Sequence, residues 1–211
     1  MDADNCDRHR LVLRVTALAL LLLVGGCGGK TPKISKLANT DVIVAFGDSL
    51  TYGTGAAEQE SYPAVLTRLI GHDVVRAGVP GEVTAQGLQR LPEVIEEYRP
   101  RLMIVCLGGN DMLRRLSVAE TRANLRAMIS MIKDHGIAVV LIGVPQPALL
   151  SSAPEFYTEL AQEFAIPYEG DVLKKVLYAA EMKSDAIHPN AKGYRRMAEA
   201  VAALLREAGA I

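Results

Sequence analysis

Short apolar runs alternate with segments of helical periodicity along most of this chain, and this alternation constrains the fold more than any other feature. The runs are rich in β-branched residues and bounded by glycine, proline or polar turn residues, which is typical of buried strands. We predict strands at residues 42–46, 73–77, 101–107, 137–142 and 166–168. Pro167 lacks the N–H that a central strand donates, so the fifth strand is expected at an edge of the sheet.

The segments between the strands carry the start and stop signals of helices. Ser117 with Glu120 forms a capping box, and Asn190 is a suitable N-cap. Strands that alternate with helices form a parallel sheet with right-handed crossovers. The predicted fold class is therefore α/β, a flavodoxin-like three-layer α/β/α sandwich with about five strands, whose order the pattern does not reveal. The predicted helices span residues 62–70, 84–97, 117–135, 152–164, 171–178 and 191–208.

The N-terminal region is typical of a secretory signal rather than of a fold. Basic residues precede the apolar run 15–24, which is too short to span a bilayer, and small residues follow it. The sequence Leu-Val-Gly-Gly-Cys at 23–27 resembles the lipobox of bacterial lipoproteins, in which the cysteine becomes the lipidated first residue. We predict a signal peptide at 1–26, a lipidated tether at 27–40 and one domain at 41–211.

Lipidation of Cys27 would hold the exported protein on the periplasmic face of the cell envelope. We expect the outer membrane rather than the inner one, because Gly28 is not an acidic, retention-like residue. The alternative is a plain signal peptide that is cleaved nearby, with Cys27 incidental.

The composition limits the classes of partner and cofactor. The net charge is −1, the charges are mixed and there is no Trp, which argues against a nucleic-acid partner. The three cysteines are too few and too scattered for a metal cluster or a disulfide framework. Cys106 lies inside an apolar run, so we expect a buried, inert thiol. The 211 residues suit one domain of ordinary size, and we expect a monomer.

Ser49 and His188 are the first candidates for chemistry. Ser49 follows the first strand, and functional groups of open α/β sheets gather beyond the carboxyl ends of the strands. His188 lies in a polar loop with Asp185 three residues before it, and a carboxylate can hold an imidazole in the tautomer of a general base. Each has a plainer interpretation, because a serine at such a turn is often a helix cap and the loop could simply precede a helix.

Two further residues could donate hydrogen bonds to an oxyanion. Gly81 offers an unhindered backbone N–H after the second strand, and Asn110 offers a side-chain amide after the third. Taken singly, Gly81 could be a turn residue and Asn110 a loop cap. Functional features after successive strands on one edge of a sheet are harder to explain as turns and caps alone.

The segments 46–50, 108–111 and 185–190, together with Gly81, resemble the four sequence blocks of the GDSL, or SGNH, hydrolase family. The segment 87–92 adds a resemblance to its thioesterase I, lysophospholipase L1 and arylesterase group. The resemblance implies a catalytic triad of Ser49, Asp185 and His188, with no metal or cofactor. It also implies an oxyanion hole formed by the Ser49 N–H, the Gly81 N–H and the Asn110 side chain.

The second block departs from the family pattern. Arg76 stands where the group commonly has Asn, and Pro80 stands where it often has Ser. These differences bear on the loop before Gly81. For the acyl pocket, the candidate lining residues are Leu50, Met112, Leu113, Pro145 and Ile187, which could equally be ordinary packing residues.

The expected function is a serine esterase that hydrolyses acyl esters, thioesters or lysophospholipids through an acyl-enzyme. A carbohydrate esterase that removes acetyl groups from polysaccharide is an alternative, because the same family scaffold serves both activities. Apolar Leu50 and Ile187 favour the longer acyl chain. A non-catalytic envelope lipoprotein is a third reading, and it predicts that a triad residue is missing or misplaced.

Overall fold

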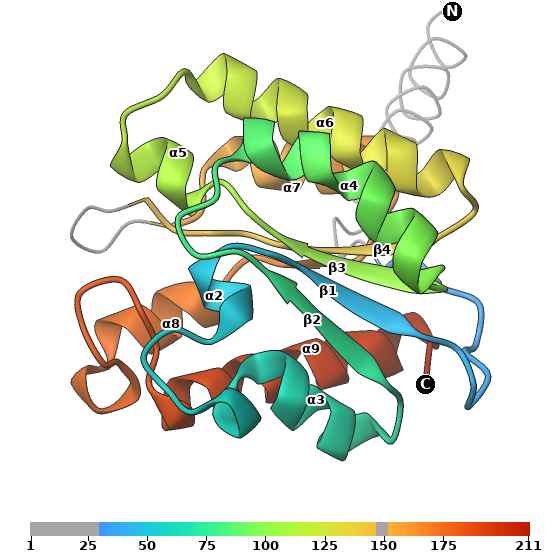
Figure 1. Cartoon of the computed structure of the whole chain (residues 1–211), viewed down its shortest axis with the longest axis horizontal. Coiled ribbons are helices and arrows are strands. Elements are labelled where there is room, and N and C mark those ends of the chain that lie inside the picture. The colour runs from blue at the N-terminus through green and yellow to red at the C-terminus, as the bar shows by residue number, and fades with distance from the viewer. Residues whose placement is uncertain (1–29, 147–151) are drawn as a thin grey trace, which may run out of the picture. The chain divides into compact units, whose positions relative to one another are not determined.

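Five parallel strands form the central sheet of the computed structural model, which describes residues 30–146 and 152–211 (Figure 1). The spatial order β2-β1-β3-β4-β5 is that of flavodoxin-like sheets, so the predicted α/β/α fold is confirmed. Cys27 and the predicted signal peptide lie outside the described residues. The strands are β1 Ile43–Gly47, β2 Val74–Gly78, β3 Leu102–Cys106, β4 Ala138–Ile142 and β5 Tyr168–Glu169.

Helices cover both faces of the sheet (Figure 1). On one face lie α3 Tyr62–Ile70, α8 Val172–Tyr178 and α9 Ala191–Ala208. On the other lie α4 Thr84–Tyr98, α6 Val118–Asp134 and α7 Glu155–Glu163. Strands β1 and β3 are buried along their whole length, which explains their continuous apolar runs. Shorter helical segments are α2 Ser49–Tyr52, η1 Glu58–Glu60, α5 Gly109–Leu113 and η2 Ala180–Met182.

Two buried tyrosines fix the loops that leave the carboxyl ends of the strands. Tyr157 on α7 donates its hydroxyl to the carbonyl of Leu107 at 2.7 Å, directly after β3. Tyr194 on α9 donates to the carbonyl of Thr54 at 2.7 Å, just beyond α2. Both side chains are fully buried, so each loop is tied to the helix layer behind it.

Residues 31–40 belong to the folded domain rather than to a tether. The Ile34 N–H donates to the Ala208 carbonyl at 3.0 Å, and the Leu37 N–H donates to the Ala210 carbonyl at 2.8 Å. The Leu37 side chain is buried. Tertiary hydrogen bonds to the end of α9 hold this segment on the domain, so the compact unit extends over 31–211 rather than beginning at 41.

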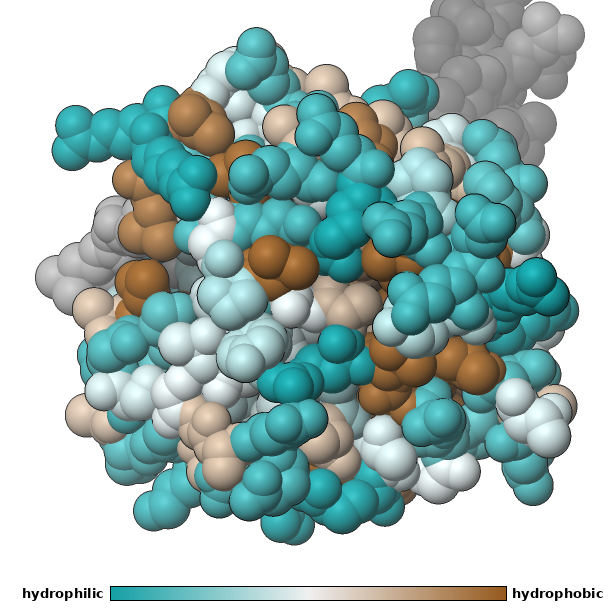
Figure 2. Space-filling model, in the orientation of Figure 1, coloured by the Kyte–Doolittle hydropathy of each residue, from teal (hydrophilic) through white to brown (hydrophobic). Residues whose placement is uncertain are grey.

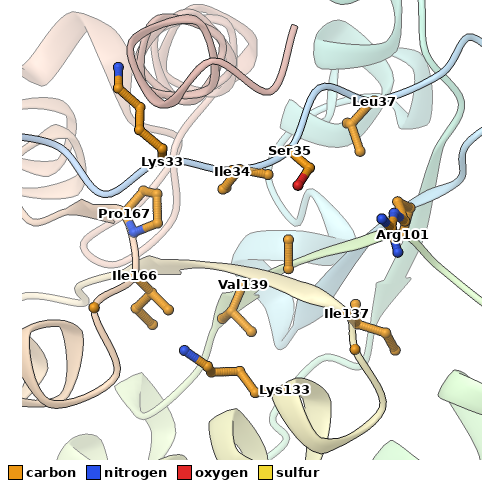
Figure 3. Close-up of a pocket in the computed structure, with 13 residues that line it drawn as sticks. Lys33, Ile34, Ser35, Leu37, Arg101, Lys133, Ile137, Val139, Ile166 and Pro167 are labelled. Carbon is orange, nitrogen blue, oxygen red and sulfur yellow. The ribbon is translucent and has the colours of Figure 1, made fainter.

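A cavity of about 320 Å³ lies between this N-terminal segment and the amino ends of β3 and β4 (Figure 3). Lys33 and Lys133 border it, but their ammonium groups already donate to the backbone carbonyls of Glu207 and Phe164. Its floor is apolar and includes Val139.

The surface shown in Figure 2 is mostly hydrophilic, with hydrophobic side chains gathered in more than one place, one of them near α5. The exposed large hydrophobic residues of the α5–α6 connection are Leu113, Leu116 and Val118. In the part of the chain that the structure describes, no helix combines the length and the apolar character needed to cross a membrane.

Candidate active site

Ser49 begins α2 directly after β1, at the carboxyl edge of the sheet. The preceding residue, Asp48, caps this short helix by accepting the Leu50 N–H at 3.0 Å. The chain turns here because Gly78 of the neighbouring strand lets the backbone of α2 approach closely. A Cβ on Gly78 would lie 2.3 Å from the Tyr52 nitrogen. The hydroxyl of Ser49 is thus held on a short, fixed helix at the sheet edge.

The His188 ring lies between Ser49 and Asp185. Its Nε2 is 3.0 Å from the Ser49 Oγ, although the two residues are 139 positions apart in the chain. Its Nδ1 is 2.8 Å from the Asp185 Oδ2. A carboxylate only accepts hydrogen bonds, so Nδ1 carries the proton and Nε2 is left free to accept the serine proton.

Asp185 is itself oriented by the backbone of its loop. Its Oδ1 accepts the N–H groups of Ile187 and His188, each at 2.8 Å. Partial burial raises the pKa of Asp185, but these bonds and the His188 ring outweigh it, so the net pKa lies below its usual value of 3.8. The carboxylate stays ionised at neutral pH.

The loop that carries Asp185 and His188 is anchored at both ends. The Ser184 N–H donates to the His188 carbonyl at 3.0 Å, and residues 183 and 189 form an isolated β-bridge. Asn190 then accepts the N–H groups of Lys192 and Gly193 at the start of α9, as its predicted role as N-cap requires.

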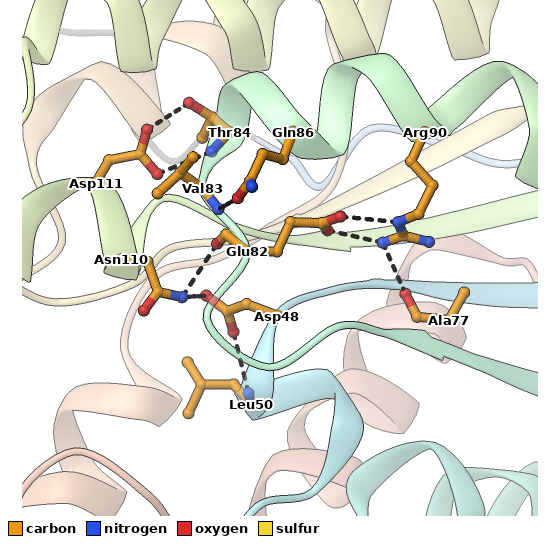
Figure 4. Close-up of polar contacts among 10 residues, drawn as sticks. All are labelled: Asp48, Leu50, Ala77, Glu82, Val83, Thr84, Gln86, Arg90, Asn110 and Asp111. Atoms are coloured by element: carbon orange, nitrogen blue, oxygen red, sulfur yellow. Dashed lines mark hydrogen bonds and ion pairs between the residues drawn. The ribbon is translucent and has the colours of Figure 1, made fainter.

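Gly81 and Asn110 border the same cavity as Ser49 and His188. Gly81 has a φ of +80°, a left-handed conformation that favours glycine. The Asn110 Nδ2 donates to the Asp48 Oδ2 at 3.2 Å and to the Glu82 carbonyl at 3.1 Å (Figure 4). The structure therefore brings all the predicted polar site residues to one edge of the sheet.

The cavity beside Ser49 has a volume of about 560 Å³. Four of the five predicted pocket residues line it, namely Leu50, Leu113, Pro145 and Ile187. Met112 does not, because its place on α5 turns it against the hydrophobic core. The prediction missed other lining residues, which lie in loops or on α8, where no sequence signal marked them: Thr54, Val144, Leu177, Tyr178 and Ala186.

A buried polar network behind Asn110 was also missed (Figure 4). Glu82 accepts two hydrogen bonds from the guanidinium of Arg90, at 2.7 and 2.8 Å, and its side chain is 4% exposed. Burial, opposed in part by the Leu50 N–H and reinforced by nearby carboxylates, raises the pKa of Asp48 to about 7. Only the position of Asp48 beside Ser49 could have singled it out from sequence.

The two residues that depart from the family pattern have defined places. Arg76 donates to the Tyr52 carbonyl at 2.6 Å and pairs with Glu58 at 3.0 Å, so it braces the end of α2. Pro80 lines the cavity beside Gly81.

Comparison with protein families matches residues 45–196 to the GDSL-like lipase/acylhydrolase family. The chain belongs to this family. The match covers the segment from β1 to α9 and includes every triad candidate. The predicted resemblance is thus confirmed. As a member of this family, the GDSL-like protein is a serine ester hydrolase.

Individual relatives agree with the family assignment. The GDSL-like chain is 31% identical over 163 residues to thioesterase 1/protease 1/lysophospholipase L1 of Escherichia coli K12, covering 74% of this chain and 78% of that protein. Its structure matches AlinE4, an SGNH-hydrolase family esterase, with a TM-score of 0.63 at 34% identity, covering 82% and 98%. It matches the crystal structure of TesA with a TM-score of 0.70 at 27% identity, covering 80% and 99%.

Proposed function

We propose that this protein is a serine esterase that hydrolyses acyl esters or thioesters through Ser49, His188 and Asp185. The contact that carries the proposal is the 3.0 Å distance between the Ser49 Oγ and the His188 Nε2, with Asp185 on the far side of the ring. A serine hydroxyl is a weak nucleophile unless an adjacent base takes its proton, and this geometry supplies the base.

The reaction would proceed in two steps. The His188 Nε2 takes the Ser49 proton as Oγ bonds to the carbonyl carbon, and the charge passes to the carbonyl oxygen. The tetrahedral intermediate collapses, the ester or thioester bond breaks, and His188 gives its proton to the leaving alcohol or thiol. Water then attacks the acyl-enzyme with His188 as base, and the acid leaves as Ser49 regains its proton.

The N–H groups of Ser49 and Gly81 and the amide of Asn110 would stabilise the charged oxygen. Their common border on the cavity supports this role, since an oxyanion hole needs donors that converge on one point beside the nucleophile. Removal of one such donor typically lowers kcat by a factor of about 10² to 10³.

The apolar lining of the cavity favours an acyl chain over a sugar. Leu50, Leu113, Pro145, Ile187 and Leu177 provide hydrocarbon surface around the nucleophile. Relatives described as a thioesterase and lysophospholipase agree with acyl-chain substrates. We infer esters and thioesters of aliphatic acids, including lysophospholipids, as the substrate class.

A fluorophosphonate probe tests the nucleophile. Wild-type protein should be labelled covalently, Ser49→Ala should not be, and His188→Ala should be labelled at least 100-fold more slowly. Ser130→Ala, on α6, is the matched control and should label like wild type. Undiminished labelling of Ser49→Ala would refute the proposal.

A series of p-nitrophenyl esters from acetyl to palmitoyl, with acetylated xylan beside it, tests the substrate class. Activity should rise from acetyl to medium chains, because each buried methylene contributes about 0.8 kcal/mol. Ile187→Ala should reduce kcat/KM for octanoyl more than for acetyl, whereas Val118→Ala, outside the cavity, should change neither. Cleavage of xylan alone would instead establish the carbohydrate esterase.

We further propose export and lipid anchoring through Cys27, from the lipobox-like sequence at 23–27. Anchoring by several acyl chains is stable, whereas one chain binds weakly. Radiolabelled palmitate should enter the wild-type protein and not the Cys27→Ala variant. Equal incorporation by both would exclude this anchor.

A further inference from the structure

The Asn110 amide has two hydrogens, and both have acceptors in this structure. One acceptor is the Asp48 Oδ2 at 3.2 Å, and the other is the Glu82 carbonyl at 3.1 Å (Figure 4). The Glu82 carbonyl has no hydrogen to give, and the Asp48 carboxyl group has none once it is ionised, so the nitrogen of Asn110, rather than its oxygen, faces them. These two acceptors set which way round the amide lies.

Both acceptors are themselves held in place. Asp48 is 1% exposed, and its other oxygen accepts the Leu50 N–H at 3.0 Å. The Glu82 side chain is fixed by Arg90, whose guanidinium also lies over the Phe46 ring at 4.3 Å. The orientation of Asn110 therefore depends on Asp48, in the turn between β1 and α2, and on Glu82, in the loop before α4.

Asp48 is the next residue to Ser49, while Asn110 lies 62 residues further along the chain. Their contact couples the turn that carries the hydroxyl to the helix that carries the amide. An oxyanion formed at Ser49 would be a third acceptor for the two amide hydrogens. The oxyanion can accept one of these hydrogens without a prior rotation of the Asn110 amide only if the amide nitrogen already faces the reaction centre.

We propose that Asp48 is a positioning residue for the oxyanion hole, whose carboxyl group selects the orientation in which Asn110 donates to the tetrahedral intermediate. This inference rests on the proposed function, because it assumes that Asn110 is an oxyanion donor. Asp48 acts through Asn110 and needs no contact with the substrate.

The surroundings of Asp48 support a role beyond capping. Its carboxyl group accepts hydrogen bonds from two neutral donors and forms no ion pair with any described residue, and burial raises its pKa to about 7. Burial of an ionisable carboxyl group costs folding free energy, and a serine could cap the same turn without this cost. The titratable groups that act on it are Glu82, Asp111, Tyr62, Cys106, Tyr157 and Tyr194.

A double-mutant cycle tests the proposal. Asp48→Asn keeps an acceptor for Leu50 but can present an amide donor to Asn110, so kcat should fall about ten- to hundredfold with KM changed less than threefold. Asn110→Ala should lower kcat by about 10² to 10³. In the Asn110→Ala background, Asp48→Asn should change kcat less than twofold, because its effect passes through the missing amide.

The outcomes separate the positioning role proposed for Asp48 from the oxyanion role proposed for Asn110. An equal loss from Asp48→Asn in both backgrounds would overturn the positioning role and leave Asn110 as an oxyanion donor. Wild-type kcat in Asn110→Ala would overturn both. Asp48→Ser, which keeps the cap but is too short to reach Asn110, should repeat the loss and serves if Asp48→Asn does not fold.

A measurement without a change at Asp48 completes the test. In His188→Ala, which removes the nearby imidazole, the side-chain ¹⁵N resonance of Asn110 should shift between pH 5 and 9 with a midpoint near 7, the pKa of Asp48. A resonance that stays constant over this range would overturn the contact on which the proposal depends.

Discussion

The guanidinium of Arg114 donates a hydrogen bond to the carbonyl oxygen of Gly81 at 2.7 Å. Arg114 directly follows α5, which carries Asn110, so this contact joins the two loops that would supply oxyanion donors after β2 and β3. It also fixes the left-handed peptide at Gly81 from outside the cavity.

Removal of this contact should weaken catalysis without unfolding the protein. We expect Arg114→Ala to lower kcat three- to tenfold. A hydrogen bond from a charged donor stabilises a structure by about 1.5–3 kcal/mol, and solvent reduces this contribution for the exposed Arg114. Arg122 forms a surface ion pair with Glu159 on the outer helices, so Arg122→Ala should leave kcat unchanged. Steady-state kinetics on a soluble ester would decide, and equal values for both variants would contradict the prediction.

Asp185→Asn should lower kcat by a factor of about 10² or more, with little change in KM. The carboxylate holds the proton on the His188 Nδ1, and an amide can hold the wrong tautomer instead. Far-ultraviolet circular dichroism should show the wild-type fold. An unaffected kcat would show that the exposed Asp185 does not orient the base.

The stability of the wild type should fall as pH rises through the titration of Asp48. Its pKa is about 7 in the folded protein and near 3.8 when unfolded, so between these values the folded state binds more protons. From pH 5 to pH 8 the wild type should lose roughly 2–3 kcal/mol of unfolding free energy relative to Asp48→Asn. Urea unfolding at both pH values measures this, and a constant difference between the proteins would disprove it.

Gly78→Ala should destabilise the protein by about 3 kcal/mol and reduce kcat. Its Cβ would lie 2.3 Å from the Tyr52 nitrogen and 2.7 Å from the Asp48 carbonyl, so the helix that begins at Ser49 must move. Gly71→Ala is the matched control, since its Cβ meets nothing within 4 Å and only its φ of +69° is unfavourable. That control should lose about 1 kcal/mol and keep its kcat, and similar results for the two would contradict the argument.

Arg90→Met should destabilise the fold by about 3 kcal/mol, because it leaves the buried carboxylate of Glu82 without its cation. The double variant Glu82→Gln/Arg90→Met should recover at least half of this loss. Thermal unfolding at one fixed pH compares them. A double variant less stable than Arg90→Met would show that the ion pair is not the cause.

The sequence predicted the strands to within a few residues, because β-branched runs bounded by turn residues seldom form any other secondary structure. It did not show α2 or α5, since helices of four or five residues have no periodicity to detect. That omission explains the error at Met112, because the turn of α5 sends Leu113 to the cavity and Met112 to the core.

Ser49, Gly81 and Asn110 were singled out by their positions after strands, and Asp185 and His188 by their spacing in a polar loop, but the contacts that support these residues were not predicted. The contacts of Asn110 with Asp48 and with the Glu82 carbonyl join three loops, and no spacing rule connects them. The same holds for residues 31–40, whose backbone bonds to the end of α9 depend on tertiary structure alone.

The pairing of Ile34 and Leu37 with Ala208 and Ala210 brings the start of the domain and its last residues together at the amino ends of the strands. Ser49 lies at the opposite, carboxyl end of β1. A bead, electrode or fused carrier attached at residue 211 would therefore leave the entrance to the reaction centre open, which makes that end of the chain the natural point of immobilisation.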